Sequence, residues 1–327
     1  MRFLSYDDVK SLLSMKEAIE IVEEAFKQLA IGAVQMPPRL RIDIREYDGQ
    51  VAVMPAFLER ASAIGLKVVS TYPANPSRHD LPTILATIVV VDATTGAVSA
   101  IIEGGFITAL RTGAVSGIAT KHLARNDSRL AAILGAGVQA ETQLMAISEV
   151  RKIEKVKVYD PVKSRRESYA RRMERDLGIE VVPFSTVEGA VQDADIIVTA
   201  TTSRCPVVKA EWIQEGTHIN SIGAPSPDAR ELDDGTIIKG RIVVDSKEAA
   251  LRETGDLVIP ISKGIISSAD IYAELGEIVT GMKSGRTASN EITIFKSVGL
   301  AIEDVAVAQR VIEKASKMGL GKIVVLS

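Results

Sequence analysis

The 327-residue sequence contains a single cysteine, Cys205, so it cannot form an internal disulfide. It has no apolar run near the roughly 20 residues that cross a bilayer. Its first residues turn acidic at Asp7 and Asp8, before any apolar stretch of signal-peptide length. These absences exclude a disulfide-rich secreted scaffold and a membrane-spanning protein, and we expect a cytoplasmic location.

The sequence also lacks a basic excess, because its formal net charge is −3. No positive field therefore attracts nucleic acid, and the basic segment 163–172 is interspersed with glutamate, as is typical of a solvated helix face. Apolar residues make up 46% and charged residues 25%, which is ordinary for a globular protein. The length exceeds what one hydrophobic core usually supports, so we expect two domains and small-molecule partners, without nucleic acid or membrane.

The first third of the chain changes its hydrophobic period. Ser14 and Glu17 form a capping box before an amphipathic helix. From Arg39 the period becomes two, and strand-rich runs continue to Val91. An alanine-rich helical stretch follows, and a polar break at 126–128 then predicts a domain boundary.

Apolar strands alternate with helices after this break, which predicts a parallel, doubly wound α/β sheet. The expected strands are Leu130–Leu134, Val156–Tyr159, Ile196–Ala200, Ile219–Ile222 and Ile242–Val244. The tail from Gly299 to Met318 is helical again, with no strand close before it. We expect this tail to return to the first domain.

A glycine-rich turn joins the first of these strands to a helix. Residues 135–140 read Gly-Ala-Gly-Val-Gln-Ala, the G-x-G-x-x-A pattern of dinucleotide binding. Gly135 permits the tight turn, Gly137 lets the backbone approach a diphosphate, and Ala140 allows close packing of helix on strand. An isolated match also fits a glycine turn in an ordinary α/β unit, but the order strand, turn, helix favours a Rossmann domain.

The second strand of this region ends at Asp160, 25 positions after Gly135. An acidic side chain here accepts hydrogen bonds from the adenosine ribose hydroxyls, which favours NAD(H). Arg165 and Arg166 follow closely, and an arginine in this place can meet a 2′-phosphate. NADP(H) therefore stays open as the alternative cofactor, with the helix surface as the other interpretation of the two arginines.

Several further segments resemble the ornithine cyclodeaminase and mu-crystallin family, which also includes an archaeal type of alanine dehydrogenase and cyclic ketimine reductases. The resemblance runs over nearly the whole chain. It is carried by Gln35-Met36-Pro37-Pro38-Arg39, Gly65-Leu66-Lys67, Tyr72-Pro73-Ala74-Asn75-Pro76, Ala109-Leu110-Arg111-Thr112-Gly113-Ala114, Glu211-Trp212, His218-Ile219-Asn220, Arg230-Glu231-Leu232-Asp233 and Thr293-Ile294-Phe295-Lys296-Ser297-Val298-Gly299.

The resemblance implies a discontinuous α+β domain around an inserted Rossmann domain. Residues 1–125 and 299–327 would form the substrate-binding and dimerisation domain, and residues 126–298 the NAD(P)-binding domain. A homodimer is implied as well.

By the same resemblance, Arg39, Lys67 and Arg111 match basic residues that bind the substrate's carboxylate beside the nicotinamide. A guanidinium offers a fork to a carboxylate, whereas a lysine is a point donor whose pKa can fall on burial. Lys67 is therefore the candidate catalytic proton donor; without the resemblance, surface solvation or an ion pair would explain Arg39 and Lys67. No metal is implied. The cofactor site would include Thr112, Gly135, Ala136, Gly137, Val138, Gln139, Asp160, Arg165, Thr199, Ala200, Thr201 and Val298.

One position departs from the pattern of the cyclodeaminase and the alanine dehydrogenase. In these relatives the glycine turn after the fifth Rossmann strand carries an aspartate with a catalytic role. Here Pro225 takes that place, and Asp228 lies three residues further on and does not match. The mu-crystallin branch, which is associated with ketimine reduction, also lacks the aspartate.

This departure favours the reduction of a preformed imine. Cyclodeamination oxidises an amine, expels ammonia and reduces a cyclic imine, so it needs proton handling at several stages. We expect an NAD(P)H-dependent oxidoreductase that reduces Δ1-pyrroline-2-carboxylate to L-proline, or the piperideine homologue. The alternatives are an alanine dehydrogenase, an ornithine cyclodeaminase and a non-catalytic binding protein; Pro225 weighs against the first two and the basic residues against the third.

Overall fold

The computed structural model describes residues 1–224 and 226–325, and the chain folds into two compact units. Unit 1 consists of Met1–Arg111 and the segment that starts at Leu300, and unit 2 is Thr112–Gly299. The first crossing between the units lies inside helix α4 (Gly104–Leu123), whereas the sequence predicts the boundary after this helix, at 125/126. The second crossing lies at 299/300. The discontinuous fold class is confirmed.

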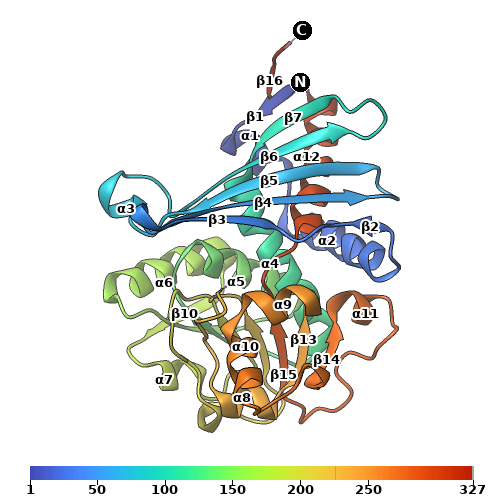
Figure 1. The fold of residues 1–327 in the computed structure, drawn as a ribbon. Helices are drawn as coiled ribbons and strands as arrows, with labels where there is room; N and C mark the ends of the chain where they lie inside the picture. Colours follow the sequence, from blue (N-terminus) through green and yellow to red (C-terminus); the bar gives the residue numbers. More distant parts are fainter. Residues whose placement is uncertain (225, 326–327) are drawn as a thin grey trace. The chain divides into compact units, whose positions relative to one another are not determined.

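Unit 1 is built on one eight-stranded sheet (Figure 1). Its helices are α1 (Tyr6–Leu12), α2 (Met15–Ala30), the short α3 (Asn75–Arg78) and α12 (Ala301–Met318). The strand order is β16 (Lys322–Ile323), β1 (Arg2–Leu4), β7 (Val98–Glu103), β6 (Ile84–Asp92), β5 (Ala63–Thr71), β4 (Gly49–Leu58) and β2 (Val34–Gln35), with β3 (Leu40–Ile44) also paired to β4.

Two local features of the sequence shape unit 1: a capping box starts helix α2, and a glycine on β5 allows close packing of helix α12. The capping box at Ser14 is present: the Glu17 backbone N–H donates to Ser14 Oγ at 3.3 Å. Helix α12 packs on β4, β5 and β6. Gly65 leaves room on β5, because a Cβ there would lie 2.6 Å from the Val89 carbonyl oxygen and 3.6 Å from Val305 Cγ2 of α12.

Unit 2 is an all-parallel sheet in which every described pair of neighbouring strands runs the same way. The chain starts at the central β8, proceeds to β9 and β10 on one side, and then crosses to β11 on the other. This is the doubly wound topology that the sequence predicts. The order is β10 (Glu180–Phe184), β9 (Lys155–Tyr159), β8 (Leu130–Leu134), β11 (Ile196–Thr199), β12 (His218–Ser221), β15 (Thr293–Lys296), β13 (Arg241–Val244) and β14 (Ile271–Glu274).

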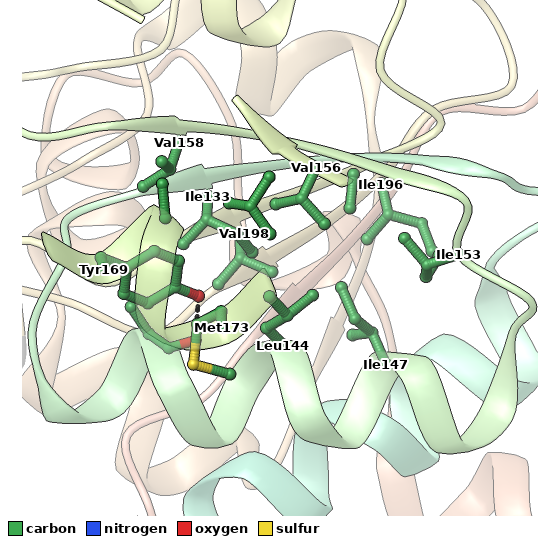
Figure 2. Packing of buried hydrophobic residues seen from close by; sticks show 14 of the residues in the cluster. Ile133, Leu144, Ile147, Ile153, Val156, Val158, Tyr169, Met173, Ile196 and Val198 are labelled. Atoms are coloured by element: carbon green, nitrogen blue, oxygen red, sulfur yellow. Dashed lines mark hydrogen bonds between the residues drawn. The ribbon is translucent and has the colours of Figure 1, made fainter. Parts of the chain in front are cut away.

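Hydrophobic clusters lie on both faces of this sheet. On one face, helices α5 (Val138–Val150) and α6 (Lys163–Leu177) pack Leu144, Ile147 and Met173 against strand residues such as Ile133 (Figure 2). The buried Tyr169 hydroxyl donates to the carbonyl of Ala140 at 2.9 Å, which ties α6 to the end of the glycine-rich turn. The other helices of unit 2 are α7 (Val187–Val191), α8 (Asp234–Lys239), α9 (Lys247–Glu253), α10 (Gly255–Ser262) and α11 (Leu275–Val279).

None of the helices in the described ranges is long and apolar enough to cross a membrane.

Candidate active site

Two of the predicted substrate-binding residues meet in a buried ionic cluster in unit 1. Lys67 Nζ of β5 lies 2.7 Å from Asp304 Oδ2 of α12, and the two side chains are 1% and 0% exposed. Arg111 of α4 places Nη1 2.7 Å from Glu303 Oε2 and Nε 3.1 Å from Asp304 Oδ1. One carboxylate, that of Asp304, therefore joins the two basic residues.

The strand and the helix bring these groups together for simple reasons. Side chains alternate along β5, so Lys67 shares the face of Gly65, on which α12 packs. Helix α12 begins at Ala301, which puts Glu303 and Asp304 in its first turn, where the helix dipole stabilises negative charge. The Leu300 backbone N–H also donates to Glu303 Oε1 at 2.8 Å.

The electrostatics of the cluster differ for its two cations. Burial, and then the charge of Arg111, lower the pKa of Lys67 to about 8, although Asp304 and Glu303 oppose this shift. Burial acts to lower the pKa of Arg111 too, but Asp304 and Glu303 outweigh it and the pKa is raised above its ordinary value. Arg111 therefore stays charged, while Lys67 can release a proton near neutral pH, as suits a proton donor.

Arg39, the third predicted basic residue, lies just before β3 and is half-buried. The strand register pairs Leu40 with Val53, and Met54 with Lys67. Arg39 lies one residue outside this pairing, and extending the register by that one residue would bring it level with Met54 and Lys67.

In unit 2 the glycine-rich turn lies where the strand order reverses, at the carboxyl ends of β8 and β11. Gly135 has φ +96°, and a Cβ there would lie 2.5 Å from the Ala200 carbonyl oxygen, so glycine is required. Gly137 precedes α5, and a Cβ there would meet nothing within 4 Å. An open backbone at a helix N-terminus fits the diphosphate of a dinucleotide.

Asp160 has a structural role that the sequence does not reveal. Its Oδ2 accepts the backbone N–H of Ala136 at 3.1 Å, and its Oδ1 accepts that of Val162 at 2.9 Å. Asp160 thus fixes the glycine-rich turn, and each carboxylate oxygen keeps a lone pair for a ribose hydroxyl. Arg166 donates to the carbonyl oxygen of Asp160 at 2.9 Å.

Arg165 lines a cavity of about 310 Å³ beside this turn. The other lining residues are Ala136, Gly137, Ser164, Ser168 and Arg172. Two guanidinium groups and two hydroxyls thus surround one hollow next to the glycine-rich turn, which fits the ribose end of a dinucleotide.

The remaining predicted cofactor residues also belong to unit 2. Thr199 is the last residue of β11, Thr201 lies two residues further on, and both bond to Glu231: Thr199 Oγ1 donates to it at 2.6 Å and the Thr201 backbone N–H at 2.7 Å. The Val298 backbone N–H donates to Asp245 Oδ2 at 2.7 Å. The Thr112 carbonyl accepts Gln143 Nε2 of α5 at 2.9 Å. Val138 and Gln139 form the first turn of α5, at the glycine-rich turn.

Sequence reasoning missed Glu303 and Asp304, although both belong to the buried ionic cluster with Lys67 and Arg111. The available signal was a pair of acidic residues at the start of the tail helix. Such a pair is also what an ordinary solvated helix N-terminus carries, so it does not indicate a site.

A second buried network, in unit 2, was missed as well. Lys296 Nζ of β15 lies 2.8 Å from Asp256 Oδ2 and donates to the Gly223 carbonyl at 2.6 Å. Asp256 Oδ1 accepts the Glu231 backbone N–H at 2.8 Å. Pro225, where the sequence departs from its relatives, lies outside the described residues.

The family model described as "Ornithine cyclodeaminase/mu-crystallin family" matches residues 1–319. The chain belongs to this family. It is 42% identical to an alanine dehydrogenase of Archaeoglobus fulgidus, over 97% of this chain and 96% of the relative. Among solved structures, the Δ1-pyrroline-2-carboxylate reductase of Thermococcus litoralis, in complex with NADH and L-proline, is 51% identical with a TM-score of 0.97, covering 99% of this chain and 100% of that one. An archaeal alanine dehydrogenase dimer with bound NAD is 41% identical with a TM-score of 0.95, covering 100% and 99%.

Proposed function

We propose that the chain is an NAD(H)-dependent oxidoreductase that reduces a cyclic ketimine carboxylate, converting Δ1-pyrroline-2-carboxylate to L-proline. The observation that carries this proposal is the buried pair of Lys67 and Arg111, in a chain 51% identical to a reductase that holds NADH and L-proline. The piperideine homologue is the alternative substrate, because one methylene changes discrimination by only about 1–3 kcal/mol.

In this proposal three basic residues, Arg39, Lys67 and Arg111, match the two polar ends of the substrate, its carboxylate and its imine nitrogen. Arg111 and Arg39 bind the carboxylate, for which a guanidinium is the preferred partner. Lys67 donates a proton at the imine nitrogen, so that the ring carbon is electrophilic when hydride arrives. NADH, when bound, would supply that hydride.

Unit 2 holds the cofactor in this proposal. The backbone of residues 135–139 and the N-terminus of α5 bind the diphosphate, Asp160 the adenosine ribose, and Thr199–Thr201 with Val298 the nicotinamide half. Asp160→Ala should raise KM for NADH more than KM for NADPH, because the ribose hydroxyls lose their acceptor. Arg166→Ala, which removes a contact to the Asp160 carbonyl, is the matched control. Equal effects on both cofactors in Asp160→Ala would remove Asp160 from ribose recognition.

The deciding experiment compares substrates on one enzyme preparation. We expect kcat/KM for Δ1-pyrroline-2-carboxylate to exceed the values for pyruvate plus ammonia and for ornithine by about 10²–10⁴-fold, which is what positioned acid–base groups contribute. The reason is that Pro225 cannot relay protons for steps that add or expel ammonia. Alanine dehydrogenation is the second candidate, because of the 42% identity to the Archaeoglobus fulgidus enzyme. If pyruvate or ornithine gives the highest kcat/KM, the proposal is wrong.

We further propose a homodimer that forms through the sheet of unit 1. The face opposite Lys67 carries exposed apolar side chains from three strands, such as Leu40 (61% exposed), Ile42 (56%), Val68 (37%) and Leu85 (40%). Register places them side by side with Val53 and Leu66. Neighbouring exposed apolar side chains on one face of a sheet are typical of an interface, and two such sheets can pack face to face.

The dimer is tested by sedimentation of Val68→Glu, with NADH binding as the control for unit 2. We expect the wild type to sediment as a dimer and the variant as a monomer that still binds NADH. A monomeric wild type contradicts the dimer and leaves the catalytic proposal unaffected.

A further inference from the structure

We propose that Asp304 is the positioning residue of this site, whose carboxylate holds Lys67 and Arg111 together to receive one substrate. The inference rests on the proposed function, because it assigns the two cations to that substrate. Each oxygen of Asp304 faces a different cation: Oδ2 lies 2.7 Å from Lys67 Nζ, and Oδ1 lies 3.1 Å from Arg111 Nε.

Two buried cations that contact the same carboxylate repel each other strongly in a medium of low dielectric constant. An anion between them reduces this repulsion, and Asp304, whose side chain is 0% exposed, occupies that position. Its neighbour Glu303 has a different role. Glu303 Oε2 binds Arg111, and Oε1 accepts the Leu300 backbone N–H at the start of α12. Asp304 therefore bridges the two cations, whereas Glu303 balances Arg111 and fixes the helix end.

The charges around Lys67 predict what the loss of Asp304 would do. The charged groups that face Lys67 are Asp304 and Glu303 of α12 and Arg111 of α4. Burial and Arg111 lower the pKa of Lys67, and Asp304 is the first of the groups that raise it. Without Asp304 the pKa of Lys67 falls below about 8, so less of the proton donor remains charged at neutral pH.

The test is the pH dependence of kcat/KM, which reports the pKa of the proton donor in the free enzyme. In the wild type we expect kcat/KM for imine reduction to be level below pH 8 and to fall above it. In Asp304→Asn we expect kcat to fall and the alkaline limb to move to lower pH by about 1–3 units, the usual effect of losing one close opposite charge.

Glu303→Gln is the matched control, because it neutralises the adjacent carboxylate that contacts Arg111. We expect a higher KM, since the guanidinium loses a fixed partner, with an alkaline limb that moves less than in Asp304→Asn. NADH binding, followed by its fluorescence, verifies that unit 2 is folded in each variant. An alkaline limb that stays in place in Asp304→Asn, or that moves as far in Glu303→Gln, overturns the proposal.

Asp304→Glu decides the matter if Asp304→Asn does not fold. It keeps the charge but displaces it by one methylene, so kcat should fall while the alkaline limb stays near that of the wild type. A shift of a full pH unit in this variant overturns the proposal. If the wild type reduces no cyclic imine, the proposed function fails, and the same profiles measured with pyruvate and ammonia still test the role of Asp304.

Discussion

Two lysines are buried in the part of the chain that the structure describes, one in each unit, and their surroundings differ. Lys67 in unit 1 and Lys296 in unit 2 are each 1% exposed, and their amines lie 2.7 and 2.8 Å from an aspartate. Lys296 also donates to the Gly223 carbonyl at 2.6 Å and to Ser221 Oγ at 3.2 Å. The described contacts of the Lys67 amine within unit 1 are its ion pair and a long hydrogen bond of 3.5 Å to Thr108 Oγ1.

Under the proposed function, this difference separates a structural lysine, Lys296, from the proposed proton donor, Lys67. An ammonium group has three donors, and at Lys296 an aspartate, a carbonyl and a hydroxyl accept from them. Lys67 is less fully satisfied and its pKa is lowered to about 8, so it gains from a ligand that offers an acceptor. Burial and ion pairing alone, which the two residues share, do not identify the active site.

Replacing Lys67 should have the largest effect, and it should be an effect on activity. In Lys67→Met we expect kcat for imine reduction to fall by about 10²–10⁴-fold, the contribution of a positioned proton donor. Stability should change little by comparison, because Asp304 keeps its bond to Arg111. Steady-state kinetics and thermal unfolding on the same preparation measure both. A variant that loses stability but retains kcat would assign Lys67 a structural role.

Replacing Lys296 should instead lower stability more than activity. Lys296→Met leaves Asp256 buried without its cation, and the charge of Lys296 also holds down the pKa of the buried Glu231, which burial raises. We expect unit 2 to lose about 3–5 kcal/mol, as when one partner of a buried ion pair is removed. Urea unfolding measures this loss. Lys155→Met is the control, because Lys155 forms a surface ion pair of the same 2.8 Å length with Glu180, worth about 0–1 kcal/mol. Equal losses in the two variants contradict the prediction.

The smallest loss of stability is expected when one hydrogen-bond acceptor of Lys296 is removed. Ser221 Oγ accepts from Lys296 at 3.2 Å and donates to Asp256 at 3.2 Å. We expect Ser221→Ala to cost about 1.5–3 kcal/mol, the range for hydrogen bonds to charged groups. Ser116→Ala, at a buried serine that donates to the Thr112 carbonyl of its own helix at 3.4 Å, should cost less. Unfolding of the two variants in urea compares these costs.

The fold was largely predictable because its signals are local. The doubly wound sheet and its glycine-rich turn follow from periodicity and from one motif, and the structure confirms them. The tail helix belongs to unit 1 as expected, but the expectation that no strand lies close before it is wrong, because β15 (Thr293–Lys296) ends shortly before α12. The cytoplasmic location and the roles of the site residues stay predictions. The first crossing between units lies within α4, where no turn or polar break marks it, so the sequence pattern offers no sign of it.

The site was predictable only in part, because its partners are distant in sequence. Lys67 and Arg111 were found through family resemblance, but the acids that neutralise them lie on a helix much further along the chain. Arg111 and Asp304 are 193 positions apart, and Lys67 and Asp304 are 237 positions apart (304 − 67). Acidic residues at a helix start have a local explanation that hides such a partnership. The partner of Lys296 is hidden for the same reason. Lys296 follows two apolar strand residues, and no neighbouring residue in the sequence indicates that it pairs with Asp256.

The position of α12 after unit 2 has a consequence for the order of folding during synthesis. Unit 2 is one continuous stretch, Thr112–Gly299, and domains generally fold as units while the chain leaves the ribosome. Unit 1 cannot be completed until α12 emerges, because that helix covers β4, β5 and β6 and brings Glu303 and Asp304. A growing chain released as far as Gly299 therefore contains a finished unit 2 and an unfinished unit 1, in which Lys67 of β5 and Arg111 of α4 still lack their acids.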